Sequence, residues 1–298
     1  MTLTRPSRWC VAFAALLMLG LARQAGADAT LVSFDDLQKK LGSAKLRLLD
    51  VRPRADYDRG HAPGAVWVDS RAAQALASRP GGLLDRDAWQ DWIVPLGIGP
   101  KTEILVFDGA RQLDSARLWW LLGYLGVENV GLIDGNFPLW ASAGRPVSSE
   151  ATTVEPGTFR VAFHADRLAN RDDVAAALMS GSAAIVDARS VGEYTGEKKM
   201  SKRGGHIPTA CRLEWSDLVD PDGRFLGKTA IEARLSSLGI KPGEPVITHC
   251  QGGGRASVDA FALERLGHPA RNFYLGWSEW GNLDATPVVE GSKSGTKP

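Results

Sequence analysis

Two copies of one sequence pattern run through this chain, and this repeat limits the possible folds more than any other feature. Four segments of the first copy recur in the same order in the second. In pairs, they are LRLLDVRPRADY (46–57) with AAIVDARSVGEY (183–194), GHAPGA (60–65) with GHIPTA (205–210), LGIGPKTEILVFD (96–108) with LGIKPGEPVITHC (238–250), and NVGLIDG (129–135) with RNFYLGW (271–277). The repeat predicts two domains of one fold in tandem. A length of 298 residues, 44% of them hydrophobic, is enough for two cores.

Each copy alternates short apolar runs with longer stretches of helical periodicity. The apolar runs end in Gly, Pro or Asp, which is typical of buried strands in a parallel sheet. The longer stretches repeat apolar residues about every 3.6 positions and end in Gly. We therefore predict an α/β fold made of tandem duplicated domains, each a parallel sheet with helices on both faces.

The segment between the copies has the composition of a linker. Residues 141–159 lack apolar periodicity and are rich in Ser, Thr, Gly and Pro. We place the N-terminal domain at residues 28–145, the linker at 146–158 and the C-terminal domain at 159–298.

The first residues read as a secretory signal peptide. Arg5 and Arg8 precede an apolar run over 11–22, and the small residues Ala25, Gly26 and Ala27 follow as a cleavage site. An uncleaved anchor is the alternative, but the run is short for a membrane span. We predict cleavage after about residue 27, a periplasmic or secreted protein, and no stable membrane association afterwards.

Charge and cysteine content exclude several classes of function. Lys+Arg is 35 and Asp+Glu is 34, so no basic field exists to attract nucleic acid. No paired Cys or His spacing of a metal site occurs, and we predict neither metal nor cofactor. Without Cys10 of the signal peptide, Cys211 and Cys250 remain. They form either one disulfide or, as we expect, a buried Cys211 and a reactive Cys250.

The second copy places Cys250 where a strand turns into a helix. PVITHC is the predicted strand, residues 251–254 form the turn, and Arg255 opens the helix. Ligands of parallel sheets bind beyond the carboxyl ends of strands. Glycine lets a ligand approach the backbone. Converging amides and the positive end of a helix favour a thiolate and an anion, and Arg255 adds a guanidinium suited to oxyanions. The alternative is an inert buried cysteine beside an ordinary tight turn.

The duplicated DxR and GHxPxA motifs, the strand ending in Cys and the loop CQGGGR together resemble the two-domain rhodaneses, which are thiosulfate and 3-mercaptopyruvate sulfurtransferases. The resemblance runs from about Phe34 to Thr286. In that family the catalytic cysteine lies in the C-terminal domain, and the matching position of the N-terminal domain is usually Asp, as Asp108 is here. The resemblance implies a non-catalytic N-terminal domain.

The resemblance also implies a reaction and a set of site residues. Cys250 takes the sulfane sulfur of thiosulfate as a persulfide and passes it to cyanide or a thiol acceptor. Arg255 anchors the anionic donor. Arg189 either binds the substrate anion or forms a salt bridge to Asp187 or Glu193. The remaining substrate-binding groups are the loop backbone at Gln251, Gly252, Gly253, Gly254 and Ala256.

The histidines near these motifs are expected to do no proton transfer. His61 and His206 of the two GHxPxA motifs are expected to be structural. His249 should point to the opposite face of its strand from Cys250, so we do not assign it as a general base.

Three other functions remain open from the sequence. The family's mercaptopyruvate enzymes have a loop that resembles CGSGVT, whereas this chain has CQGGGR. They also carry a second arginine after DxR, and Thr195 or a near neighbour takes its place here. Both differences favour thiosulfate as the donor. Cysteine-dependent phosphatases use a longer Cys-X5-Arg loop. A persulfide carrier without fast turnover is the third, in which the basic insert Lys198, Lys199, Lys202 and Arg203 docks an acidic partner.

Overall fold

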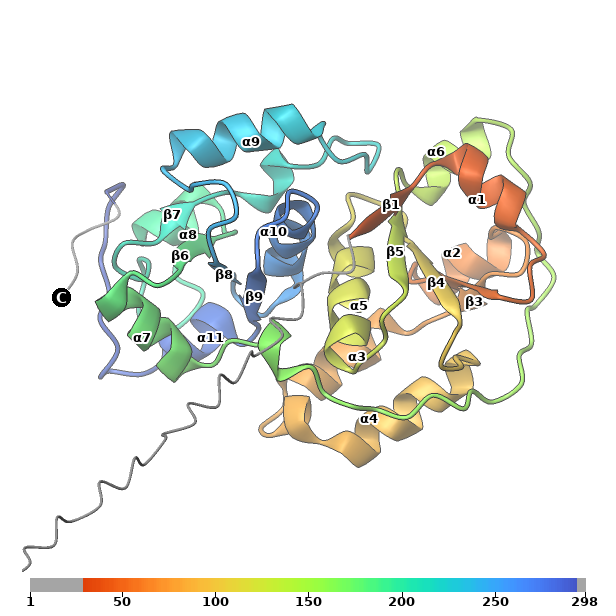
Figure 1. The fold of residues 1–298 in the computed structure, drawn as a ribbon, viewed down its shortest axis with the longest axis horizontal. Helices are drawn as coiled ribbons and strands as arrows, with labels where there is room; N and C mark the ends of the chain where they lie inside the picture. Colours follow the sequence, from red (N-terminus) through yellow and green to blue (C-terminus); the bar gives the residue numbers. More distant parts are fainter. Residues whose placement is uncertain (1–28, 294–298) are drawn as a thin grey trace, which may run out of the picture.

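The computed structural model describes residues 29–293 as two α/β domains lying side by side (Figure 1). The predicted signal peptide, residues 1–27, lies outside the described residues. Among residues 29–293, no helix has the length and apolar character needed to cross a membrane.

The N-terminal domain contains a five-stranded sheet in the order β1-β5-β4-β2-β3. All of its strand pairs are parallel, as predicted. The strands are β1 (Thr30–Val32), β2 (Leu46–Asp50), β3 (Val66–Trp67), β4 (Glu103–Phe107) and β5 (Val130–Ile133). Strands β2, β4 and β5 lie in the apolar parts of the repeated segments 46–57, 96–108 and 129–135, where strands are expected. The short edge strands β1 and β3 have too few residues to give a periodic signal.

Helices cover both faces of this sheet, and a separate hydrophobic cluster lies beneath each layer. Buried residues of α1, α2 and α6 pack on one face, and those of α3, α4 and α5 pack on the other. The helices are α1 (Phe34–Lys40), α2 (Arg54–Arg59), α3 (Ser70–Ser78), α4 (Arg86–Ile93), α5 (Leu113–Tyr124) and α6 (Phe137–Ser142). The Ser33 side chain caps α1 by accepting a hydrogen bond from the Asp36 amide.

The C-terminal domain repeats this arrangement with a parallel sheet in the order β7-β6-β8-β9. Its elements are α7 (Arg171–Ser180), β6 (Ala184–Asp187), α8 (Val191–Thr195), β7 (Cys211–Arg212), α9 (Lys228–Ser237), β8 (Val246–His249), α10 (Gly254–Glu264), β9 (Ala270–Phe273) and α11 (Gly276–Trp280). A single parallel bridge between Leu168 and Asn272 stands where β1 pairs with β5 in the first domain.

The connection between the domains is longer than predicted. Backbone hydrogen bonds hold it against the N-terminal domain, from Gly157 N to Val94 O (2.7 Å) and from His164 N to Tyr124 O (2.8 Å). Residues 159–164, which the sequence places in the C-terminal domain, therefore belong with the connecting segment. Composition could not predict this boundary, because the segment contains apolar residues such as Val161, which is buried against the first domain.

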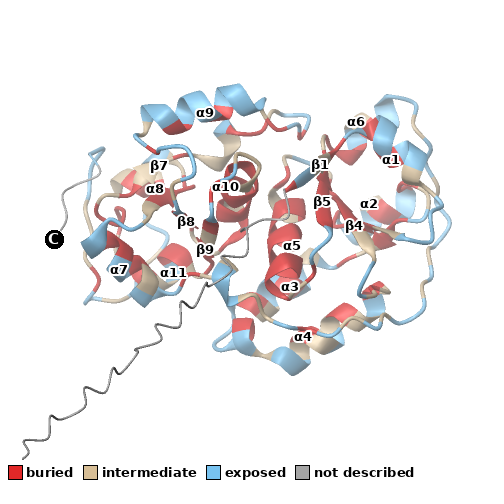
Figure 2. Cartoon of the chain, viewed as in Figure 1, coloured by how far each residue is buried: buried red, intermediate tan, exposed pale blue. Residues whose placement is uncertain are grey.

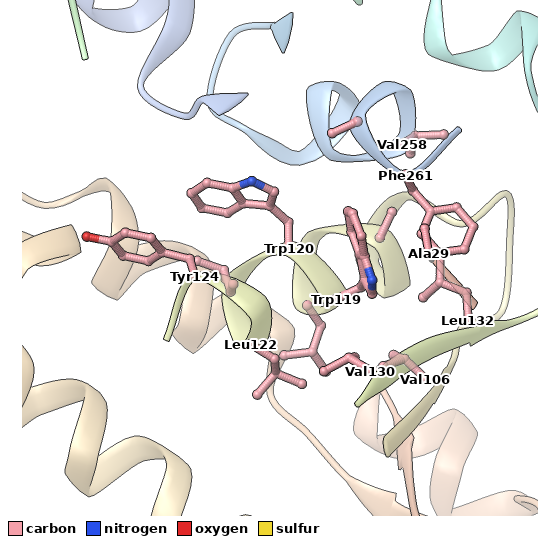
Figure 3. Close-up of a cluster of buried hydrophobic side chains, with 14 of the residues drawn as sticks. Ala29, Val106, Trp119, Trp120, Leu122, Tyr124, Val130, Leu132, Val258 and Phe261 are labelled. Atoms are coloured by element: carbon pink, nitrogen blue, oxygen red, sulfur yellow. The ribbon is translucent and has the colours of Figure 1, made fainter. Parts of the chain in front are cut away.

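Helices α5 and α10 pack against each other and join the two domains through one continuous hydrophobic cluster. Trp119 and Trp120 of α5 extend toward α10 (Figure 3). The Trp119 and Phe261 rings meet edge to face with centroids 4.9 Å apart, and Trp120 stacks on Tyr274 at 5.1 Å. Both helices are almost wholly buried (Figure 2). This packing holds the start of α10 against the N-terminal domain.

Candidate active site

Cys250 is the first residue after β8, which lies between β6 and β9 in its sheet. Its side chain is only 2% exposed and packs with Ala188 and Ala256, with Trp215 partly covering this small cluster. Cys211 and Cys250 are both free thiols in the described residues, so the disulfide alternative is not present. Burial raises the pKa of Cys211 to about 12, which leaves Cys250 as the thiol with functional potential.

The loop after Cys250 contains several backbone amides that have no acceptor among residues 29–293. Residues 250–253 lead into α10, which begins at Gly254, one residue earlier than predicted. Within residues 29–293, only one amide of the turn donates to a loop carbonyl, from Gly254 N to Gly252 O (3.0 Å). The amides without a protein acceptor there belong to Gln251, Gly252, Gly253, Arg255 and Ala256. Unpaired amides at a helix N-terminus form an anion site.

Two of the three glycines are required by bulky side chains beneath the loop. Gly253 has φ +79°, and a Cβ there would overlap the Tyr274 ring. A Cβ at Gly254 would lie 2.8 Å from Cζ of Arg117, a residue of α5 in the other domain. Helix α11 holds the loop on the other side, because the Trp277 amide donates to the Cys250 carbonyl at 2.7 Å. The loop is therefore fixed by both domains.

Arg255, which is expected to anchor the anionic donor, is paired with a carboxylate in the structure. It forms a two-point ion pair with Glu193 of α8, with Nη1–Oε2 2.6 Å and Nη2–Oε1 2.9 Å. Burial alone would raise the pKa of Glu193, but hydrogen bonds from Arg255 and Ser190 outweigh it and lower the pKa to about 2. The carboxylate therefore stays charged and offsets the charge of Arg255.

The Gln251 side chain turns toward the basic insert. Its Nε2 donates to the Met200 carbonyl and to the Ser201 hydroxyl, both at 3.1 Å. The insert therefore borders the loop. Two of its cations are engaged within the protein, since Lys202 pairs with Asp284 (2.7 Å) and Arg203 donates to the Thr286 carbonyl (2.7 Å).

Of the two roles expected for Arg189, the structure contains the salt bridge to Asp187. Its side chain is 1% exposed, pairs with Asp187 at 2.6 Å and donates to the Gly205 carbonyl at 2.7 Å. Arg52 makes the same contacts in the first domain, with Asp50 at 2.7 Å and the Gly60 carbonyl at 2.7 Å. The DxR motif therefore ties a strand end to the following loop in both copies.

The three histidines near the motifs, His61, His206 and His249, are all fully buried. Both ring nitrogens of His206 lie within hydrogen-bond distance of backbone carbonyls, those of Tyr194 (2.8 Å) and Lys293 (3.0 Å). His61 has the equivalent contacts in the first domain. His249 is fully buried, and burial lowers its pKa to about 4 although Asp187 opposes the shift. A neutral, inaccessible imidazole agrees with leaving His249 out of the mechanism.

The first domain closes the equivalent loop with its own groups. Asp108 accepts hydrogen bonds from the Ala110 amide (3.0 Å) and the Ser115 hydroxyl (3.2 Å). Burial raises its pKa to about 6. Arg111 of this loop reaches the other domain and donates to the Ser216 carbonyl (2.6 Å). This loop has a carboxylate in place of the thiol and is covered by the C-terminal domain.

Sequence reasoning missed four residues around Cys250. Glu193 carried a signal, because Ser190 and Glu193 form the S-x-x-E capping box of α8. Arg117 and Tyr274 carried none, since they meet the loop only through the packing of α5 and β9. Asp259 of α10 is fully buried and has no hydrogen-bond partner within the described residues for either carboxylate oxygen. Burial raises the pKa of Asp259 well above its usual range, and nearby Cys250 adds to the shift.

Comparison with known proteins identifies both domains. A family model for the rhodanese-like domain matches residues 33–143 and 170–283. Over 255 residues the chain is 35% identical to a thiosulfate sulfurtransferase of Azotobacter vinelandii, covering 85% of this chain and 94% of the relative. It is 31% identical over 279 residues to the sulfur carrier protein TtuD of Thermus thermophilus, covering 88% and 97%. The crystal structure of SseA from Escherichia coli, a 3-mercaptopyruvate sulfotransferase, matches with TM-score 0.73 and 26% identity over 84% of this chain and 99% of that chain.

The duplicated parallel α/β fold defines a transferase of two related domains, and the second domain has a cysteine at the turn between a strand and a helix. The chain belongs to the rhodanese family of sulfurtransferases, with two rhodanese-like domains. The fold class and the family predicted from the repeat are confirmed.

Proposed function

We propose that this sulfurtransferase moves the sulfane sulfur of thiosulfate to cyanide or a thiol through a persulfide on Cys250. The Cys250 thiolate attacks the outer sulfur, the S–S bond of thiosulfate breaks, and sulfite leaves with the electron pair. The acceptor then attacks the outer sulfur of the persulfide. Cyanide leaves as thiocyanate, and the thiolate is restored.

The observation that carries this proposal is the free thiol of Cys250 directly before a loop whose amides, within residues 29–293, have no protein acceptor. Both steps put negative charge on the sulfur of Cys250 or on the atom bound to it. Preorganised N–H donors stabilise such charge without reorganising during the reaction. The donors proposed for this role are the amides of Gln251, Gly252, Gly253, Arg255 and Ala256.

Arg255 is proposed to hold the sulfonate end of the donor while still paired with Glu193. A guanidinium has five N–H donors, and the pair with Glu193 uses two of them. The other donors keep the fork geometry that suits oxyanions. Because Glu193 offsets much of the charge, the loop amides carry more of the binding than the sequence suggested.

Thiosulfate is the proposed donor, with 3-mercaptopyruvate as the competing one. The arginine at the end of the loop favours a compact dianion over a keto acid, and the relative from Azotobacter vinelandii is named for thiosulfate. Initial rates with each donor, measured side by side with cyanide as acceptor, test the choice. A larger kcat/KM for thiosulfate supports the proposal, whereas a larger kcat/KM for 3-mercaptopyruvate contradicts it.

A persulfide carrier is the second candidate, because a relative from Thermus thermophilus is named as a sulfur carrier. Turnover with thiosulfate and cyanide separates the two. An enzyme completes many cycles, while a carrier releases about one equivalent of sulfite and then stops.

We also propose that the protein is exported and loses residues 1–27. Expression of the full chain in a Gram-negative host followed by N-terminal sequencing of the periplasmic protein tests this. A mature chain starting near Asp28 supports export, and an intact Met1 in the cytoplasmic fraction contradicts it.

A further inference from the structure

Arg117 brings a cation from the N-terminal domain to the underside of the catalytic loop. It lies on α5, the helix that packs against α10 across the domain interface. Its guanidinium touches the backbone of Gly254, where an added Cβ would lie 3.0 Å from Nε and 2.8 Å from Cζ. Gly254 is the first residue of α10, so the cation lies beside the loop that follows Cys250.

The guanidinium of Arg117 is buried with few partners. Its side chain is 9% exposed, and within residues 29–293 neither Nε nor Nη1 donates a hydrogen bond. It forms an ion pair with Asp114 of the same helix, at 3.8 Å between Nε and Oδ1, and the Asp114 side chain is half exposed. Burying a cation with so little compensation is costly, and a methionine would fill the same space at lower cost.

The other arginines near the loop are differently placed. Arg255 pairs with the buried carboxylate of Glu193, and Arg189 pairs with the buried carboxylate of Asp187, both at 2.6 Å. Their charges are therefore largely offset. The carboxylate paired with Arg117 is farther away, at 3.8 Å, and half exposed, so more of the positive potential of Arg117 reaches the loop.

Tyr274 links Arg117 to Cys250 electrostatically. Its ring lies under Gly253. Burial raises the pKa of Tyr274 to about 12, with Arg117 opposing the shift and Cys250 adding to it. Both charges are therefore close enough to act on one phenol. The titratable and charged groups around Cys250, taken over all packed elements, are Asp114, Arg117, Asp187, Arg189, Glu193, His249, Arg255, Asp259 and Tyr274.

We propose that Arg117 is a positioning residue supplied by the N-terminal domain: it holds the Gly254 backbone and stabilises negative charge on the sulfur of Cys250. This rests on the proposed function only in taking Cys250 as the nucleophile. The N-terminal domain, which has Asp108 in place of a cysteine, thus contributes to the reactivity of the other domain through α5.

The test is the pH dependence of Cys250 alkylation by iodoacetamide, a neutral reagent, followed on the Cys250 peptide without any sulfur donor. In Arg117→Met the midpoint of the alkylation rate should move to higher pH. The rate at a pH below both midpoints should fall about three- to tenfold. Arg117→Lys keeps the charge and should restore most of the reactivity.

Arg167→Met is the matched control for damage to the interface. Arg167 also bridges the domains, pairing with Glu264 at 3.2 Å and lying 4.8 Å from the Trp119 ring, but at the far end of α10. Its variant should alkylate like the wild type. An unchanged midpoint in folded Arg117→Met, or an equal shift in Arg167→Met, would overturn the proposal.

Asp114→Asn keeps the proposal testable if Arg117→Met does not fold. Its side chain is half exposed, so the substitution is compatible with folding. Removing the carboxylate that offsets Arg117 should lower the midpoint, and an unchanged midpoint would overturn the proposal. Since no thiosulfate is used, failure here is distinct from failure of the proposed reaction, which would show as no sulfite release from the wild type.

Discussion

Arg255 and Glu193 form a two-point ion pair beside the catalytic loop, with N–O distances of 2.6 and 2.9 Å. The pair joins the first turn of α10 to α8 and so fixes the orientation of the guanidinium. It also means that removing either partner leaves a poorly exposed charge without its counterion. Tests of Arg255 therefore need the matching change at Glu193.

Arg255→Ala is expected to impair the reaction with thiosulfate far more than the discharge of the persulfide. Loss of a charge-assisted contact is worth about 1.5 to 3 kcal/mol, so kcat/KM for thiosulfate should fall about ten- to a hundredfold. The double variant Glu193→Gln/Arg255→Ala removes the pair without leaving a charge, and its persulfide should decay with cyanide close to the wild-type rate. If thiosulfate dependence is unchanged in both variants, Arg255 does not hold the donor.

Glu193→Gln should weaken the fold near neutral pH but not in strong acid. The folded-state pKa of Glu193 is lowered to about 2, so its charge stabilises the fold above its unfolded value of 4.5. That stabilisation is lost as the pH falls toward 2. We expect a difference in unfolding free energy of about 1 to 3 kcal/mol near neutral pH, narrowing below pH about 4. Urea unfolding at several pH values measures this difference in unfolding free energy. A difference that does not depend on pH would contradict this account.

Cys250→Ser should abolish sulfur transfer, whereas Asp108→Asn should keep most of it. The chemistry needs a thiolate, and Asp108 bonds only within its own domain. Steady-state rates with thiosulfate and cyanide measure both variants. Equal inactivity would contradict the assignment of a non-catalytic N-terminal domain.

Asp108→Asn should also stabilise the protein at alkaline pH. Burial raises the folded-state pKa of Asp108 from 3.8 to about 6, so ionisation costs folding free energy as the pH rises through this window. Above pH about 6, the variant should have an unfolding free energy about 1 to 2 kcal/mol larger than that of the wild type, and it should unfold at a higher urea concentration. Below pH 3.8, the variant and the wild type should have similar unfolding free energies. A variant less stable at every pH would mean that the hydrogen bonds of Asp108 matter more than its charge.

Arg189→Lys should act on stability rather than on substrate binding. Arg189 is buried and holds both Asp187 and the Gly205 carbonyl, and lysine cannot keep that forked geometry. We expect a loss of about 2 to 4 kcal/mol in unfolding free energy and an unchanged KM for thiosulfate in the folded protein. A raised KM for thiosulfate with an unchanged unfolding free energy would indicate that Arg189 binds the substrate.

The repeat in the sequence was sufficient to predict the architecture and the position of Cys250. Both signals are local, because strand-ending motifs such as DxR and CQGGGR follow apolar runs of the right length. The electrostatics of the site could not be predicted in the same way. The ion pair of Arg255 was not predicted, since nothing in the sequence around Arg255 indicates that Glu193 lies opposite it. For Arg189 the salt bridge to Asp187 was one of two alternatives that the sequence left open. The contact between Arg117 and Gly254 could not be predicted from the sequence, because it forms only when α5 packs on α10. The sheet edges were missed because β3 and β7 each have two residues.

The central claim is that Cys250 carries the transferred sulfur. The most direct test is mass spectrometry of the intact protein and of its Cys250 peptide after mixing with thiosulfate and removing excess donor. We predict the added mass of one sulfur atom on that peptide, one equivalent of released sulfite, and loss of the added mass on treatment with cyanide. An unmodified Cys250 peptide in protein that turns over thiosulfate, or added sulfur found on Cys211 instead, would contradict the account.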